Sequence, residues 1–339
     1  MRFGSPRLLA AIASLVVLAA CGGSTAPTSG GNVSLKIMVG GLNKQIYLPN
    51  MLAQRLGYFK AENLDVTLID EGSGQASEEE VVAGNVDAGS GAYSHPMVLN
   101  TQGKKIETIC QFGIAPGEAE VVDASLTNIT GPKDLAGKNL GVTDLGSGTH
   151  VLTQAILGTA GVNPGSAHYV AVGAGDTFIA ALQQKKIAAG MTTYPTISRL
   201  VNSGKGKILV SLLTPADTRA ALGGDYPFIS IYMRSDWVAS HKPQVQRLVN
   251  AYVKTLKWIG SHTPQEIADK LPVDYYAGDK DLYLAALTGS MPMFSPDGKM
   301  PAGAPDFVLK VLQTYNNNVK GKTIDLTKTF TNEFADAAK

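Results

Sequence analysis

The chain of 339 residues carries 29 basic and 28 acidic side chains, and 44% of its residues are hydrophobic. This near-neutral balance gives no indication of a nucleic acid, another polyanion or an acidic membrane surface as partner. One hydrophobic core rarely serves more than about 250–300 residues, so the length predicts two lobes.

The first residues have the pattern of a secretory signal. Arg2 and Arg7 precede an uncharged run that ends Leu18-Ala19-Ala20-Cys21. We interpret residues 1–20 as a lipoprotein signal peptide and Cys21 as the acylated first residue of the mature protein. The alternative, a membrane span, needs about 20 apolar residues, and this run is shorter. Removing residues 1–20 deletes two arginines and no acid, which leaves 27 basic and 28 acidic side chains.

Residues 21–32 are rich in Gly, Ser, Thr and Pro, which is typical of a flexible tether. Apart from Cys21 the chain has only Cys110, in the apolar run IETICQFGI. No disulfide can therefore form within the mature fold, and no cysteine-ligated metal site is expected. We expect Cys110 to be a small core residue.

Strands and helices alternate in two stretches of the chain. Apolar runs, helical spacing and turn glycines predict strand–helix–strand–helix–strand in residues 35–91 and again in 139–195. In the first stretch the strands are Leu35–Gly40, Leu64–Ile69 and Asn85–Gly91, and in the second they are Asn139–Thr143, Tyr169–Val172 and the run AAGMTT.

The strings LGYFKAENLDVTLID and GSGQASEEEVVAGNVDAGSG resemble the opening of the solute-binding proteins of bacterial ABC importers for nitrate, sulfonates, taurine and thiamine pyrimidines, the SsuA/THI5-like (NMT1) family. Asn63 stands where the family usually has glycine, a mild departure because Asn tolerates the left-handed conformation. Weaker similarity continues through Asp134–Val142 and His241–Ile259. The resemblance implies a type II periplasmic binding protein fold, with two α/β lobes and the ligand between them.

Two chain crossings should form the hinge between the lobes. We expect the outward link at Glu120–Leu126 and the return at Tyr226–Arg234, so that lobe I comprises residues 33–122 and 228–339 and lobe II residues 123–227. The later helices then belong to lobe I. One begins at the capping box Thr263–Glu266, and Ser290–Gly303 should be a loop.

The chain lacks the common catalytic and cofactor-binding motifs. The chain contains no Gly-x-Ser-x-Gly, no phosphate loop and no His-Glu-x-x-His, and its five histidines lack metal-ligand spacing. Gly173-Ala174-Gly175 begins like a dinucleotide fingerprint, but Phe178 stands at the third glycine. We therefore expect neither an enzyme nor a cofactor nor a metal. The yeast-type pyrimidine synthases, which the fold also suggests, carry a cysteine-rich motif that Cys110 alone cannot supply.

Ligands of open α/β sheets bind at the carboxyl ends of the strands, and this position selects the site candidates. Each candidate could instead have a purely structural role, as a helix cap, a turn former or an aromatic packed in the core. For Asp176 we expect such a structural role, as the N-cap of its helix. Where the family has an aspartate and a glutamate, this chain has Ala189 or Gly190 and Tyr194. The ligand-binding candidates are Asn43, Gln45, Tyr47, Ser73, Gln75, Tyr93, Ser94 and His95 from the first lobe, and Ser147, Gly148, Thr149, His150, Thr192 and Tyr194 from the second.

The turn Gly146-Ser147-Gly148-Thr149 enters a helix, where free N–H groups and the helix dipole favour an anionic oxygen. Tyr47, Tyr93 and Tyr194 offer apolar faces that nitrate could not use, and Lys44 is the fixed cation nearby.

We therefore expect a lipid-anchored, monomeric, extracytoplasmic binding protein. It should capture a small organic anion, a sulfonate or carboxylate with or without an aromatic ring, and deliver it to an ABC permease. A neutral pyrimidine between the tyrosines and a ligand-presenting sensor remain alternatives.

Overall fold

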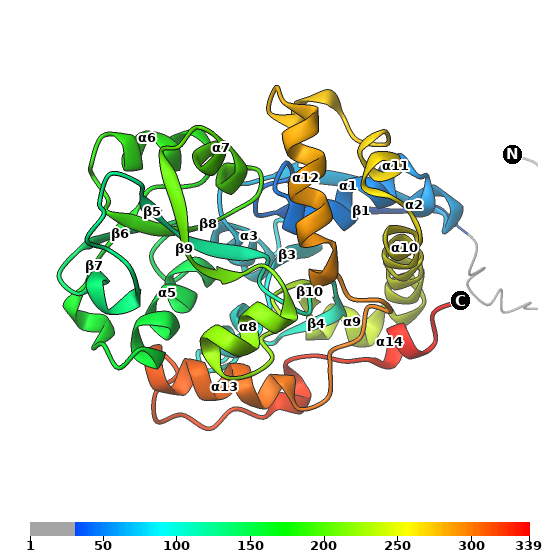
Figure 1. Ribbon diagram of the computed structural model, residues 1–339. Helices are drawn as coiled ribbons and strands as arrows, with labels where there is room; N and C mark the ends of the chain where they lie inside the picture. Colours follow the sequence, from blue (N-terminus) through cyan, green and yellow to red (C-terminus); the bar gives the residue numbers. More distant parts are fainter. Residues whose placement is uncertain (1–30) are drawn as a thin grey trace, which may run out of the picture. The chain divides into compact units, whose positions relative to one another are not determined.

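The computed structural model describes residues 31–339. The predicted signal peptide, Cys21 and most of the predicted tether therefore lie outside the described residues. The described chain forms two five-stranded mixed sheets with helices, as Figure 1 shows. This arrangement confirms the predicted α/β fold class with two lobes.

The first sheet has the strand order β2-β1-β3-β10-β4. Strand β1 pairs in parallel with β2 and β3, whereas β10 is antiparallel to β3 and β4. The strands are β1 (Val33–Val39), β2 (Leu64–Asp70), β3 (Ala88–Ala92), β4 (Ile106–Gln111) and β10 (Ile229–Arg234). The helices of this lobe are α1 (Leu48–Arg55), α2 (Tyr58–Ala61), α3 (Gly74–Ala83), α4 (Ser94–Asn100), α9 (Ser235–Ser240), α10 (Lys242–Ser261), α11 (Pro264–Ala268), α12 (Lys280–Ser290), α13 (Ala304–Tyr315) and α14 (Glu333–Asp336).

The second sheet repeats this plan with the order β7-β6-β8-β5-β9. Strand β6 pairs in parallel with β7 and β8, and β5 is antiparallel to β8 and β9. The strands are β5 (Glu118–Asp123), β6 (Asn139–Val142), β7 (His168–Ala171), β8 (Ala189–Thr193) and β9 (Gly206–Leu212). The helices are α5 (Gly148–Thr159), α6 (Asp176–Gln183), α7 (Thr196–Asn202) and α8 (Pro215–Leu222).

Each sheet contains three strands paired in parallel and one strand that runs antiparallel to its neighbours. This antiparallel strand is the first one after the chain crosses from the other lobe. Strand β5 enters the second sheet from β4, and β10 returns to the first sheet after α8. The predicted outward link at Glu120–Leu126 is therefore wrong, because most of it is strand β5, and the crossing lies between Gln111 and Glu118. The lobe boundary at residue 122 moves toward the N-terminus for the same reason: β5 hydrogen-bonds to β8 and β9.

Local conformation follows the residue types at several predicted positions. Asn63 has a φ of +53° and Gly57 a φ of +73°, so both end their helical turns in the left-handed region. Thr263 and Glu266 form the predicted capping box at the start of α11. Asp176 is not an N-cap, because α6 begins at Asp176 after Gly175, and its carboxylate instead lies 2.7 Å from Arg199 Nη2.

The largest apolar cluster continues from one sheet to the other. It joins first-lobe residues such as Ile37 and Phe112 to Leu152 and Ile156 of α5. Helix α13 packs against both α5 and α4, so it also contacts both lobes. Cys110 is buried in this cluster, as predicted.

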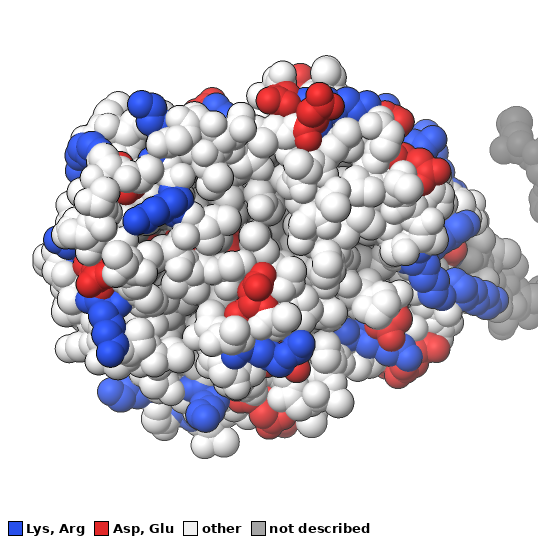
Figure 2. Space-filling model, viewed as in Figure 1, with Lys and Arg blue, Asp and Glu red and all other residues white. Residues whose placement is uncertain are grey.

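Basic and acidic side chains are interspersed on the face seen in Figure 2, without a large area of one sign. This distribution agrees with the near-neutral composition. Within residues 31–339, no helix combines the length and the hydrophobicity required to cross a membrane.

Candidate functional site

A small cavity lies at the carboxyl ends of the parallel strands, between loops of both lobes. Its volume is about 20 Å³, room for about one water molecule. Backbone contact across the lobes keeps it narrow: Gln45 N donates to Tyr194 O at 3.1 Å. An organic ligand therefore requires the walls to separate. The walls are formed by Lys44, Ile46, Tyr47, Gly74, Ala92, His95, Glu118, Thr143, Ser147, Gly148, Thr149 and Phe228.

Lys44 supplies a buried cation to the cavity. It follows β1, it is 9% exposed, and its Nζ donates to Gly40 O at 2.5 Å and Gly72 O at 3.2 Å. Burial lowers the pKa of Lys44 to about 8, although the negative charges of Glu118 and Asp70 oppose this shift. At neutral pH the ammonium group is thus charged and able to attract an anion.

Glu118, the first residue of β5, supplies a buried carboxyl group to the same cavity. It is 4% exposed, and within the described structure its Oε2 has no hydrogen-bond partner. Burial raises the pKa of Glu118 to about 8; the charge of Lys44 opposes this shift and that of Glu120 adds to it. The cavity therefore contains a hydrogen-bonding group that no protein atom of residues 31–339 satisfies.

The first turn of α5 lies against the cavity as the spacing predicts. Ser147 is the N-cap, and its Oγ accepts from His150 N and donates to Asp144 O. Thr149 Oγ1 lies 2.7 Å from Ser147 Oγ and accepts from Thr143 N. The two hydroxyl groups are thus engaged within the lobe. The N–H groups of Gly148 and Thr149 are first-turn donors without intrahelical acceptors and remain the candidates for an anion.

His95 also lines the cavity, and one of its two ring nitrogens is held by a protein partner. Its Nδ1 lies 2.9 Å from Glu78 Oε2, and the side chain is almost fully buried. Its Nε2 has no hydrogen-bond partner among the described residues. Because Glu78 fixes the orientation of the ring, Nε2 can contact a ligand.

Of the three tyrosines expected to stack on a ligand, the structure places one at the cavity. Tyr47 lines it, whereas Tyr93 is in the core with its hydroxyl group 2.7 Å from Thr329 Oγ1. Tyr194 lines a different groove, beside Ile197 and Leu282. Phe228, which precedes β10, lines the cavity instead.

The remaining candidates lie around the cavity rather than in its wall. Asn43 faces an outer chamber of about 330 Å³, which shares Lys44 with the cavity. Other candidates have structural partners or core positions: Gln45 bonds to Tyr283 and Ser290, Ser73 caps α3, Gln75 donates to Glu79, His150 stacks on Tyr169, and Ser94 and Thr192 are buried.

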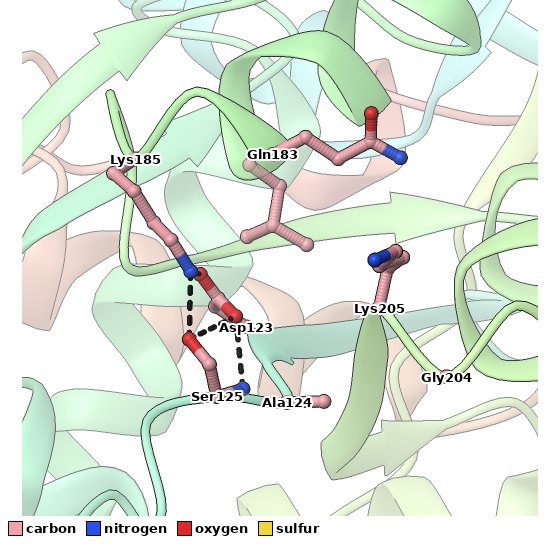
Figure 3. A pocket seen from close by; sticks show the side chains of 8 residues that line it. Asp123, Ala124, Ser125, Gln183, Lys185, Gly204 and Lys205 are labelled. Carbon is pink, nitrogen blue, oxygen red and sulfur yellow. Dashed lines mark hydrogen bonds and ion pairs between the residues drawn. The ribbon is translucent and has the colours of Figure 1, made fainter.

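A larger surface pocket of about 480 Å³ lies at the far end of β5 (Figure 3). Its acid, Asp123, is bound by Lys185 and Ser125. The start and end of β5 are about 17 Å apart at the usual rise per residue, so this pocket is separate from the cavity. Within residues 31–339, no group of three or more acidic, His or Cys side chains could hold a metal ion.

The model of the NMT1/THI5-like family matches residues 46–267. A solved structure from Bordetella bronchiseptica RB50 is 33% identical with a TM-score of 0.85, and the match covers 90% of this chain and 96% of that one. The chain belongs to the NMT1/THI5-like family.

More distant structures share the fold of this NMT1/THI5-like chain. The alkanesulfonate-binding protein SsuA from Xanthomonas axonopodis pv. citri, bound to MOPS, is 14% identical with a TM-score of 0.71, over 89% of this chain and 99% of that one. The ligand-binding component of an ABC-type import system from Staphylococcus aureus also has 14% identity and a TM-score of 0.71, over 91% and 99%. Among curated protein sequences, none matches the chain.

Two residues of the cavity wall, Glu118 and Phe228, were not among the ligand-binding residues predicted from the sequence. Lys44 was predicted only as a cation near the site. One signal for Glu118 was present: in GEAEVVD, acids alternate with Ala119 and Val121, which indicates a strand with carboxyl groups on one face. Nothing local indicates that this face meets the loop after β1.

Proposed function

We propose that this protein is an extracytoplasmic solute-binding protein that captures a small organic acid between its lobes and delivers it to an ABC importer, without catalysing a reaction. The observation that carries the proposal is a small cavity between loops of the two lobes, whose wall contains both the buried Lys44 and the first turn of α5. Family membership and the fold shared with binding components of import systems support it.

The acid group of the ligand binds between Lys44 and the start of α5, because these are the cationic and dipolar donors of the cavity. Tyr47 and Phe228 supply apolar contact to the remainder of the ligand. A bare inorganic anion would leave these rings without contact.

Titration calorimetry tests this assignment with ethanesulfonate, propionate, benzoate, nitrate and a neutral aminopyrimidine. We expect at least one organic acid to bind more tightly than nitrate and the pyrimidine. Tight binding of the pyrimidine with no acid bound would refute the anion site, and nitrate as the best ligand would refute the role of the rings.

A sensor that presents its ligand to a membrane kinase would give the same titrations. Loss of solute uptake on deletion of the gene distinguishes an importer from such a sensor.

The proposal includes a lipid anchor at Cys21, which is supported by the signal pattern that precedes it. Cells grown with a labelled fatty acid should incorporate label into the wild-type protein, and Cys21→Ser should carry none. Two or more acyl chains anchor a protein stably, so the wild type should sediment with membranes. Label that persists in Cys21→Ser would contradict the anchor.

A further inference from the structure

A backbone hydrogen bond joins the two lobes beside the cavity. Gln45 N, in the turn after β1, donates at 3.1 Å to Tyr194 O, in the loop between β8 and α7. We call this contact the interlobe bond. Gln45 stands between Lys44 and Ile46, which both line the cavity, so the interlobe bond limits the distance between the cavity walls. Gln45 itself lies outside that wall.

The side chain of Gln45 holds its backbone in this position. Its Nε2 donates to Tyr283 O at 3.2 Å, and its Oε1 accepts from Ser290 Oγ at 2.9 Å. Both partners belong to α12, and Gln45 is buried. Helix α12 also packs against α7 of the second lobe, and Leu282 of α12 lines one groove together with Tyr194 (Figure 1). Two further buried hydrogen bonds therefore support the interlobe bond from the first lobe.

The interlobe bond and an organic acid cannot coexist in this arrangement of the lobes. The cavity of about 20 Å³ holds about one water molecule. Even a small sulfonate or carboxylate contains several heavy atoms, each comparable in size with a water molecule. The walls must separate to admit such a ligand, and the interlobe bond opposes that separation.

We propose that the interlobe bond is an autoinhibitory contact, which must break before an organic acid binds between the lobes. Molecules with the bond are then in equilibrium with binding-competent molecules, and the apparent affinity is reduced by the competent fraction. Gln45 thus acts as a positioning residue that sets affinity without touching the ligand. The inference rests on the proposed function, because it assumes that the ligand binds in this cavity.

Two substitutions of Gln45 isolate the interlobe bond. Gln45→Ala removes the side chain and keeps the N–H group, whereas Gln45→Pro removes both. Proline suits this backbone because Gln45 is the first residue of a 3-10 turn and Lys44 before it is extended, with φ −76° and ψ 135°.

Calorimetry with the full mature chain compares the two variants. The probe is whichever of ethanesulfonate, propionate and benzoate binds the wild type most tightly. One hydrogen bond between neutral groups shifts an equilibrium by about 2- to 12-fold, so Gln45→Pro should bind the probe more tightly than Gln45→Ala by about this factor.

Hydrogen exchange reports on the same bond in the wild-type chain, without a substitution. A saturating concentration of the probe should accelerate exchange of the Gln45 amide, because binding breaks its bond to Tyr194 O. The Tyr47 amide is the matched control: it donates to Lys44 O at 3.0 Å within the same turn, and its exchange should not become faster. A purely structural role of Gln45 would give slower exchange on binding, since a ligand stabilises the folded chain.

The outcomes separate this inference from the proposed function. If an acid binds, and Gln45→Pro binds it no more tightly than Gln45→Ala or the Gln45 amide exchanges more slowly, autoinhibition is overturned and the organic-acid site stands. If thermal unfolding shows that Gln45→Pro does not fold, the exchange of the wild-type Gln45 amide decides. Failure of every acid to bind the wild type and Gln45→Pro overturns the proposed function and this inference together.

Discussion

Replacing Lys44 with Met is expected to weaken organic-acid binding about 100-fold. A hydrogen bond from a buried ammonium group to a charged partner contributes about 2–3 kcal/mol, which corresponds to roughly 30- to 150-fold in affinity. Lys44 is nine-tenths buried, so solvent does not screen this interaction. Calorimetric titration with ethanesulfonate measures the effect.

Lys60→Met is the matched control, since Lys60 lies exposed on α2. It should leave the dissociation constant within about twofold of the wild-type value. Thermal unfolding of both variants distinguishes loss of the site from loss of the fold, because Lys44 also donates to Gly40 O and Gly72 O. Wild-type affinity in a folded Lys44→Met protein would exclude the proposed anion site.

The same site predicts how binding depends on pH. The pKa of Lys44 is lowered to about 8 and that of Glu118 is raised to about 8, each mainly by burial. As pH rises through 8, Lys44 loses its positive charge and Glu118 gains a negative one, and both changes oppose an anion. Affinity for ethanesulfonate, which stays ionised, should therefore fall between pH 7 and pH 9 in the wild type, and less steeply in Glu118→Gln.

Gly190→Ala is expected to destabilise the fold by about 3 kcal/mol, because overpacking against backbone cannot relax cheaply. Gly190 of β8 pairs with Gly141 of β6, and a Cβ on Gly190 would lie 2.6 Å from Gly141 O and 2.9 Å from Phe178 Cε2. Urea unfolding measures the loss.

Replacing Gly260 with Ala is expected to stabilise the protein, in contrast to the same substitution at Gly190. Gly260 lies in α10, and a Cβ there would have no atom within 4 Å. Because Ala favours a helix over Gly, the change should stabilise the protein by about 0.5–1 kcal/mol. A Gly190→Ala protein as stable as the wild type would show that β6 and β8 can separate to admit a methyl group.

Elements whose signals are local could be predicted from the residue pattern. Apolar runs such as Leu64–Ile69, the left-handed Asn63 and the Thr263–Glu266 capping box depend on neighbouring residues, and the structure has them as predicted. Alternation of strands and helices also determined the fold class, because parallel strands require helical crossovers.

Which side chains meet at the cavity depends on contacts between distant segments. Most of strand β5 was predicted to be part of a linker, because the alternation of its residues does not show that it pairs with β8 and β9 of the second sheet. That pairing brings Glu118 to Lys44, 74 positions earlier in the sequence, and places Phe228 rather than Tyr93 or Tyr194 at the cavity. Contacts between distant segments depend on strand order and on packing between lobes, and no local pattern of residues records either.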